Sequence, residues 1–194
     1  TEDLVQELLN SGWVGLNNAR AGMTVAGNRF DMRGVNDPHI RYDRYDEVAG
    51  PFDPDAGLRL GVTHAPYLRV LDPMAADGAD LIIAGHTHGG QVCVPGYGAL
   101  VTNCDLDPAR AKGLSSHEGA ALHVSAGLGT NPYAPIRLAC PPEATMLHLL
   151  PRELPWQTCE SGRIVVEPAL ARLVDGQDAF GNPVAWLSLD TPHD

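Results

Sequence analysis

The sequence predicts an α/β domain built on mixed β-sheets. Three observations lead to this expectation: a strand–helix–strand pattern lies between residues 58 and 84, a small β-meander precedes it, and further short strands follow it. A chain of 194 residues is long enough for one domain with a substantial core.

The strand–helix–strand pattern is the clearest of the three. Residues 58–63 predict a strand that ends in Thr-His-Ala-Pro at 63–66, where the proline requires an extended residue before it. Residues 67–78 carry apolar side chains at helical spacing, and residues 81–84 are a short apolar run typical of a buried strand. Each strand is therefore followed at once by histidine, at the edge where open α/β sheets bind ligands.

The remaining elements are predicted from local patterns. Residues 1–12 predict a capped amphipathic helix, because Thr1 and two acidic residues precede apolar residues at helical spacing. The region 99–119 shows no periodicity and is expected to be a loop. Strands are predicted at 13–16, 23–26, 29–35, 91–94, 121–125, 136–138 and 145–150. A turn at 26–28 connects the second of these strands to the third.

Three histidines indicate a metal site at this edge. In an extended or turning segment, residues i and i+2 project to one side, so His86 and His88 are expected to present two imidazoles together while Thr87 faces away. Gly89 and Gly90 carry no side chains and leave room there for a substrate. His64 supplies the third imidazole, and neutral imidazole is a common ligand of transition metals.

These motifs resemble a known family. Gly-His-Thr-His-Gly-Gly-Gln at 85–91, Thr-His-Ala-Pro at 63–66, and the later segments at 125–130, 135–137 and 142–144 are similar to the second half of the calcineurin-like metallophosphoesterases, in a bacterial branch. The resemblance covers about residues 1–150. It implies the later half of a four-layer αββα sandwich and a metal-dependent phosphoester hydrolase, acting on a phosphodiester or a phosphomonoester.

The resemblance also implies a metal centre that this chain does not complete. His64 and His86 would bind one divalent ion of a binuclear pair (manganese, iron or zinc), and His88 the other. The family's Asp-x-His, Gly-Asp-x-x-Asp and Gly-Asn-His motifs, which include the bridging aspartate and the catalytic histidine, have no credible match in this sequence. The catalytic residue is therefore unknown, and an upstream segment or an oligomeric partner is expected to supply the missing ligands.

Asp37, His39 and Arg41 are expected to border the site on the substrate side. Asp37-x-His39 mimics the missing first motif, but the residues between it and His64 contain neither of the motifs that should follow. Arginine binds phosphate through its planar guanidinium, although solvated surface arginines are the more common case.

Composition narrows the classes of partner. With 13 Lys and Arg against 24 Asp and Glu the net charge is -11, which disfavours nucleic acid as a partner. A phosphoesterase with this charge needs metal cations or local arginines to hold an anionic phosphoester. The sequence has neither a transmembrane run nor signal-peptide features, so a cytoplasmic or membrane-peripheral location is expected. The four cysteines form no Cys-x-x-Cys pair, and a bridge between Cys93 and Cys104 is an alternative to reduced thiols.

Two units are expected along the chain: residues 1–152 as the later half of the catalytic domain, and residues 153–194 as a C-terminal extension of unknown role. Two alternatives to the hydrolase remain open. The first is a catalytically incomplete module that binds metal or phosphate and needs a partner segment, and the second is a mononuclear zinc hydrolase with a three-histidine site.

Overall fold

A six-stranded mixed sheet organises the chain. The computed structural model describes residues 2–147, 149, 174–177 and 183–186. The order of strands in the sheet is β1-β2-β3-β4-β8-β7; the four inner strands run parallel, and β1 and β7 pair antiparallel at the two edges. The bounds are β1 Ala19–Val25, β2 Asn28–Gly34, β3 Leu58–Val62, β4 Leu81–Ala84, β7 Gly113–His117 and β8 Ala120–Val124.

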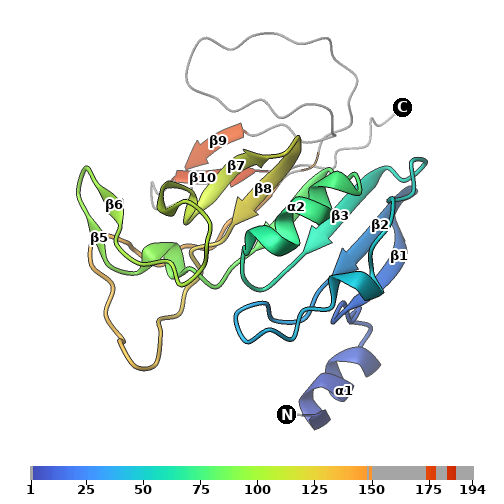
Figure 1. Cartoon of the computed structure of the whole chain (residues 1–194), viewed down its shortest axis with the longest axis horizontal. Helices are drawn as coiled ribbons and strands as arrows, with labels where there is room; N and C mark the ends of the chain where they lie inside the picture. The colour runs from blue at the N-terminus through green and yellow to red at the C-terminus, as the bar shows by residue number, and fades with distance from the viewer. Residues whose placement is uncertain (1, 148, 150–173, 178–182, 187–194) are drawn as a thin grey trace, which may run out of the picture.

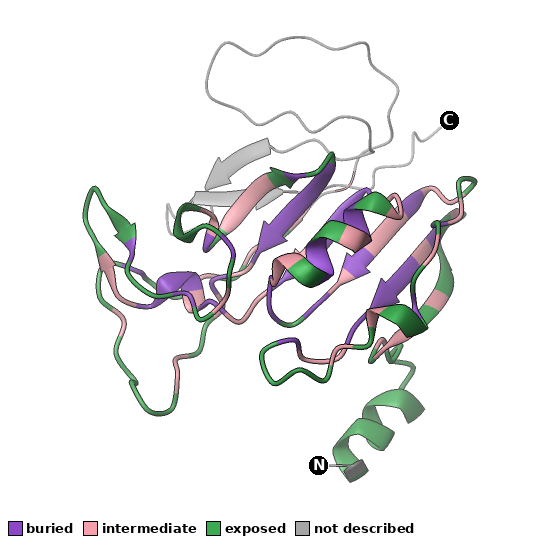
Figure 2. Ribbon diagram, in the orientation of Figure 1, coloured by how far each residue is buried: buried purple, intermediate pink, exposed green. Residues whose placement is uncertain are grey.

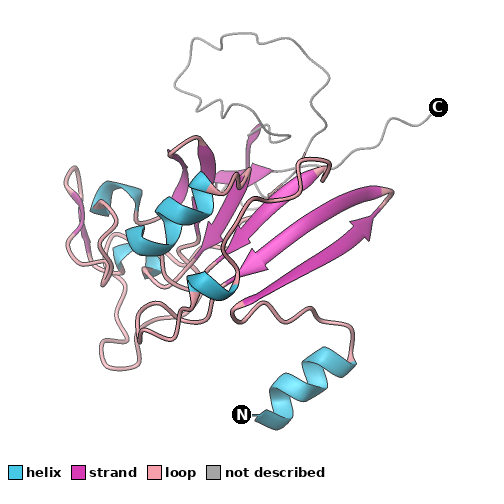
Figure 3. Cartoon of the chain, turned by 45° about the vertical axis from the view of Figure 1, so that its right-hand side comes forward, coloured by secondary structure: helices cyan, strands magenta, loops and turns pink. Residues whose placement is uncertain are grey.

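The predicted α/β class and mixed sheet are confirmed. Helix α2, Leu68–Ala76, connects β3 to β4 and lies across one face of the sheet, as Figure 1 and Figure 3 show. Its inner side buries Val70, Leu71, Met74 and Ala75 against Ile82 and Leu122 of the central strands. Burying a side chain the size of Val70, Leu71 or Met74 stabilises the folded state by about 1.5–3 kcal/mol. The main core of the described residues lies on this face.

The opposite face of the sheet has a second, smaller core. Phe30, Met32, Leu58, Leu81 and Ala121 are buried there, and half-buried apolar side chains from Leu16 to Leu149 pack around them. Within the described residues no second large sheet covers this face. The four-layer sandwich therefore stays a prediction.

Helix α1, Glu2–Asn10, forms where the capping pattern predicts it but stands apart from the sheet (Figure 1). Figure 2 shows that its described surface is exposed on all sides, including the apolar residues Leu4, Val5, Leu8 and Leu9. The helix is followed by irregular chain in place of the strand predicted at 13–16.

Short helical turns and hairpins complete the described part of the chain. The 3-10 turns are η1 Tyr45–Glu47, η2 His88–Gly90 and η3 Pro108–Arg110; one small hairpin pairs β5 Cys93–Val94 with β6 Gly98–Ala99, and another pairs β9 Val174–Gln177 with β10 Pro183–Trp186. In the described part of the chain, no helix is long and apolar enough to cross a membrane.

Three local predictions are wrong after residue 90. The region 99–119, expected to be a loop, contains β7, whose half-buried edge position leaves only a weak apolar alternation. Residues 136–138 form a single bridge, between Val92 and Leu138, and the described residues of 145–150 form no named strand. The proposed boundary between residues 152 and 153 lies outside the described residues.

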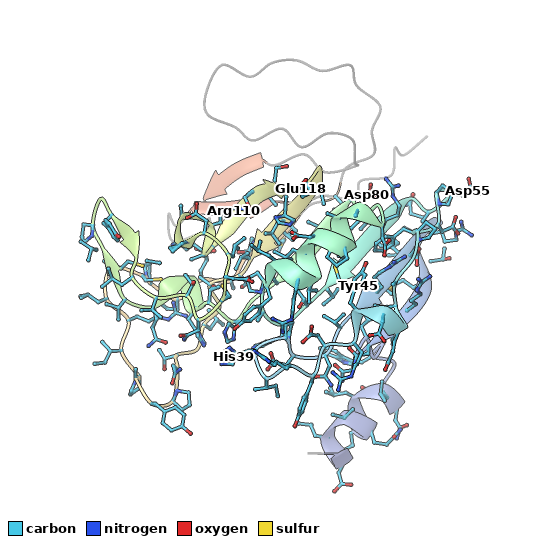
Figure 4. The ribbon with its side chains drawn as sticks, in the orientation of Figure 1. His39, Tyr45, Asp55, Asp80, Arg110 and Glu118 are labelled. Atoms are coloured by element: carbon cyan, nitrogen blue, oxygen red, sulfur yellow. The ribbon has the colours of Figure 1, made fainter. Side chains whose placement is uncertain are left out.

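The carboxyl ends of β2, β3 and β4 meet at one edge of the sheet, because these strands are parallel neighbours. His39 lies at this edge, on the loop after β2, whereas Asp80 just before β4 lies at the opposite edge (Figure 4). The loops that follow β3 and β4 carry His64 and His86 to the same edge as His39.

Candidate functional site

His64 and His86 come together at the edge formed by β3 and β4. The Nδ1 atom of His86 lies 3.2 Å from the Nε2 atom of His64, and the ring centroids are 5.0 Å apart. His64 is exposed and His86 half-buried. Two nitrogens that bind one zinc ion tetrahedrally at about 2.0–2.1 Å stand about 3.3 Å apart, so this separation fits two ligands of one ion.

The backbone carbonyl of Asn103 sets the tautomer of His86. Its oxygen lies 3.2 Å from Nε2 of His86, and a carbonyl only accepts, so Nε2 carries the proton and Nδ1 faces His64 with its lone pair. A histidine that donates its second nitrogen to a carbonyl in this way is the usual arrangement around bound metals. Without metal, Nε2–H of His64 donates to Nδ1 of His86.

Burial keeps His86 neutral. Burial lowers the pKa of His86 below the ordinary value, and the hydrogen bond to Asn103 opposes this. Electrostatic interaction with His39 and His64 lowers the pKa of His86 further, and the Asp37 carboxylate raises it. A neutral imidazole is the form that binds a metal ion, because protonation removes the lone pair.

His39 and Tyr67 extend this network. The ring centroids of His39 and His86 are 4.4 Å apart, and Nδ1 of His39 lies 3.2 Å from the Tyr67 hydroxyl. That hydroxyl donates to the same Asn103 carbonyl at 2.9 Å. The sequence did not predict the roles of Tyr67 and Asn103. Both depend on the backbone carbonyl of Asn103, and every residue type has such a carbonyl.

Asp37 faces His64 from the loop after β2. Its Oδ1 accepts the backbone N–H of His39 at 2.8 Å, and its Oδ2 lies 4.0 Å from Nε2 of His64. The structure thus places Asp37 and His39 beside His64 and His86, and their role on the substrate side of the site stays a prediction. Arg41 is exposed on the same loop, and its backbone N–H donates to Pro38.

We expected His88 to join the imidazoles of His64 and His86, but it does not. Its Nδ1 lies 3.2 Å from the carbonyl oxygen of Gly129, so Nδ1–H donates there and Nε2 keeps its lone pair. The i/i+2 argument fails because the segment is not extended: φ is +70° at His86 and +51° at His88, with Thr87 in a right-handed helical conformation between them. Thr87 does face away from the histidines, buried and bonded to Ala111.

The described part of the chain holds no group of three or more His, Cys, Asp or Glu side chains placed to hold a metal ion. The imidazoles are instead grouped as a pair, His64 with His86, and a single His88. The assignment of all three as metal ligands stays a prediction.

Gly89 and Gly90 are both buried, and neighbouring residues occupy the places that a Cβ at either position would take. Room for a substrate beside them stays a prediction. A Cβ at Gly89 would lie 2.8 Å from the Cys140 sulfur, and one at Gly90 would overlap the Cβ of Ala99. Glycine is required here for close backbone packing at positive φ, +66° and +84° respectively.

Arg137 holds three loops together behind the histidines. Its guanidinium donates to the carbonyl oxygens of His88 at 3.0 Å, of Ala126 at 2.8 Å and of Gly129 at 2.6 Å. Because Gly129 also accepts from the ring of His88, Arg137 orients that imidazole indirectly. The side chain contacts three further carbonyls, at Gly127, Cys140 and Pro141.

The cysteines of the described residues are reduced, and the alternative of a bridge between Cys93 and Cys104 is not what the structure has. Both residues are free thiols, as is Cys140, and Cys159 lies outside the described residues. Cys104 packs against the main core, whereas Cys93 lies beside Cys140.

Comparison with known proteins finds a phosphodiesterase among the relatives. The chain is 31% identical over 138 residues to "Phosphodiesterase YaeI" of Escherichia coli (strain K12), which covers 67% of this chain and 48% of that protein. It is 29% identical over 138 residues to "Uncharacterized protein YpbG" of Bacillus subtilis (strain 168), covering 71% of this chain and 49% of the relative. The chain thus spans about half the length of the curated relatives it matches.

A protein-family model matches the C-terminal part of the chain. Residues 142–194 match the bacterial transglutaminase-like N-terminal region. The match includes the whole segment predicted as a C-terminal extension and begins before it. No solved structure matches the chain.

Proposed function

We propose that this chain forms part of a metal-dependent phosphoester hydrolase, in which His64 and His86 bind one divalent metal ion and His88 binds a second. The observation that carries the proposal is the 3.2 Å separation of Nδ1 of His86 and Nε2 of His64 at the carboxyl ends of parallel strands. The grouping of the imidazoles as a pair and a single residue agrees with the roles that the family resemblance implies. Similarity to a protein named a phosphodiesterase makes a phosphodiester the first substrate class to test.

The donor set fits a metal ion only in part. The pair supplies two neutral nitrogens at a separation suited to one ion, and His88 supplies a third nitrogen elsewhere. A binuclear centre needs anionic ligands between its cations, which repel each other strongly when about 3.5–4 Å apart. We therefore propose that residues additional to these 194 complete the site.

A metal bound here would neutralise phosphate charge and lower the pKa of a bound water. The chain's own residues orient and hold the ligands. Asn103 and Gly129 fix the protonated nitrogens of His86 and His88, and Asp37 places a carboxylate beside His64. Arg41 is exposed on the same edge, where a guanidinium can bind a phosphate oxygen.

A module that binds metal without catalysis is the second candidate. It is favoured by the described residues, which contain no group of three or more His, Cys, Asp or Glu side chains placed to hold a metal ion. The mononuclear three-histidine zinc hydrolase is less consistent with the structure, because His88 turns to Gly129 and not to the pair.

Metal analysis of the purified 194-residue chain, together with a chromogenic phosphodiester assay in manganese, tests the proposal. We expect at most one metal ion per chain and no appreciable phosphodiesterase activity from the chain alone. Supplying the missing ligands from an upstream segment, on the same chain or as a separate fragment, should restore both a second metal and turnover. Two tightly bound metal ions with metal-dependent turnover in the chain alone would show that its own residues complete the centre.

A further inference from the structure

Two thiols far apart in the sequence meet on one backbone carbonyl. The Sγ atoms of Cys93 and Cys140 each lie 3.3 Å from the carbonyl oxygen of Gly89. The Sγ atom of Cys140 also lies 3.4 Å from the carbonyl oxygen of His88. Burial first, and then the charge of Cys140, raise the pKa of the Cys93 thiol. The sulfurs are thus neighbours in the reduced protein, whereas Cys104 lies apart, against the main core.

The two thiols differ in access. Cys140 is buried, with 2% of its surface exposed, whereas Cys93 is half-buried and lines a cavity of about 290 Å³. Val94, Pro95, Ala109 and Lys112 line the same cavity. A small molecule that enters this cavity reaches Cys93 first, with Cys140 behind it.

Lys112 also lines the cavity. Its ammonium is partly exposed and lies 3.6 Å from Oε2 of Glu143, which is partly exposed as well. In a chain with a net charge of -11, such a local cation is what draws an anionic small molecule to the cavity.

We propose that Cys93 and Cys140 form a thiol–disulfide exchange site, in which Cys93 reacts with a small anionic disulfide and Cys140 resolves the product into an internal disulfide. Cys93 loses its proton and attacks one sulfur of the small disulfide. A Cys93–small-molecule bond forms, and the sulfur–sulfur bond of the reagent breaks to release one thiol, which takes up that proton. Cys140 then loses its proton and attacks the Cys93 sulfur, which releases the second small thiol. Two protein thiols are oxidised, and one small disulfide is reduced to two thiols.

Oxidation changes the loop that carries His86 and His88. Disulfide sulfurs have no hydrogen to donate, so the carbonyls of Gly89 and His88 lose the two S–H donors that they share. This segment already holds positive φ at His86, His88, Gly89 and Gly90, and its backbone is constrained by these contacts.

The test uses the reduced full chain incubated with oxidised glutathione, followed by alkylation of the remaining thiols and peptide mass spectrometry. We expect one internal bridge, between Cys93 and Cys140, which dithiothreitol reverses. A bridge through Cys104 or Cys159, or no bridge under conditions that oxidise a small dithiol, would overturn the proposal. This result on the wild-type chain does not depend on whether any variant folds, nor on metal or activity.

Variants test the order of the two steps. In Cys140→Ser, Cys93 should keep glutathione as a stable mixed disulfide, because no second thiol resolves it. In Cys93→Ser, Cys140 should remain reduced, whereas Cys104→Ser, the matched control, should behave as the wild type does. Rapid glutathione addition to Cys140 in Cys93→Ser would reverse the assigned order and contradict the proposed access route.

Lys112→Gln tests the recognition of an anionic reagent. It should slow the reaction with oxidised glutathione several-fold while leaving the reaction with hydroxyethyl disulfide, which is neutral, at the wild-type rate. Equal slowing with both reagents would show that Lys112 acts on the protein structure and not on the charge of the reagent.

Discussion

Nδ1 of His86 lies 3.2 Å from Nε2 of His64, although the two residues belong to loops after different strands. Parallel pairing of β3 and β4 brings the loops to one edge, and the Asn103 carbonyl turns the His86 ring so that Nδ1 faces its partner. This pairing explains why single substitutions in either loop should act on the same metal ion.

His64→Ala and His86→Ala should each lower the affinity of the chain for one Zn²⁺ or Mn²⁺ ion by at least about tenfold, the smallest loss expected when even a supporting residue of a metal site is removed. The fold should be retained, because both residues lie in loops outside the core. Isothermal titration calorimetry measures the affinity, and circular dichroism checks the fold.

The control for this experiment is His88→Ala. Because His88 turns to Gly129, its removal should leave the affinity for the first metal ion near the wild-type value, while costing activity in the completed enzyme. His123→Leu should affect neither property. If His88→Ala weakened the first metal ion as much as His86→Ala, a three-histidine site would be the better description.

Arg137→Ala should lower the free energy of unfolding by about 1–3 kcal/mol, because several backbone carbonyls lose a charged hydrogen-bond donor. Urea unfolding followed by circular dichroism measures the change. Arg137→Lys should recover only part of the loss, since an ammonium does not match the planar fork of a guanidinium.

Arg41→Ala is the matched surface control for Arg137. Its side chain is exposed, and its removal should change the free energy of unfolding by no more than about 0.5 kcal/mol. Equal losses at Arg41 and Arg137 would contradict the role given to Arg137 in holding the loops.

Gly90→Ala should lower the free energy of unfolding by about 2–4 kcal/mol, because the new Cβ would overlap Ala99 and the backbone has φ of +84°. Gly96→Ala is matched in φ, at +79°, but its Cβ would meet no atom within 4 Å. It should cost only about 1 kcal/mol. Urea unfolding of both variants separates the cost of the overlap with Ala99 from the cost of positive φ. Similar losses of unfolding free energy in the two variants would show that the structure relaxes to relieve the overlap.

His123 should make the chain sensitive to acid. Burial lowers the pKa of His123 below the ordinary value, with Glu143 opposing, and neither ring nitrogen has a hydrogen-bond partner in the described part of the chain. The unfolded chain therefore binds more protons than the folded chain once pH falls to about 6.5, and the free energy of unfolding decreases from there down to the lowered pKa.

His123→Leu should reduce this decrease, because the buried imidazole is removed, and should leave stability near neutral pH little changed. The measurement is urea unfolding at several pH values between about 7 and 5, the range around the ordinary pKa of histidine. A wild-type slope in His123→Leu would assign the acid sensitivity to another group.

The sequence by itself predicts the parts of the fold that depend on local pattern. Strands β3 and β4 and helix α2 appear within a few residues of their predicted bounds, because apolar spacing and the punctuation by glycine and proline are local signals. The same signals place His64 and His86 after adjacent strands. The edge strand β7 is missed, because only one of its sides is paired and its residues are half-buried.

Only the tertiary structure decides where the side chains of the loops point. Positive φ at His86 and His88 breaks the alternation on which the convergence of three imidazoles depended, and distant carbonyls at Asn103 and Gly129 orient the two rings separately. Gly89 and Gly90 likewise face Cys140 and Ala99, residues that no local pattern connects to them. The periodicity of apolar residues indicates which face of a helix or strand is buried. The direction of a side chain in a loop depends instead on the sign of φ and on hydrogen-bond partners that come together only after the chain has folded.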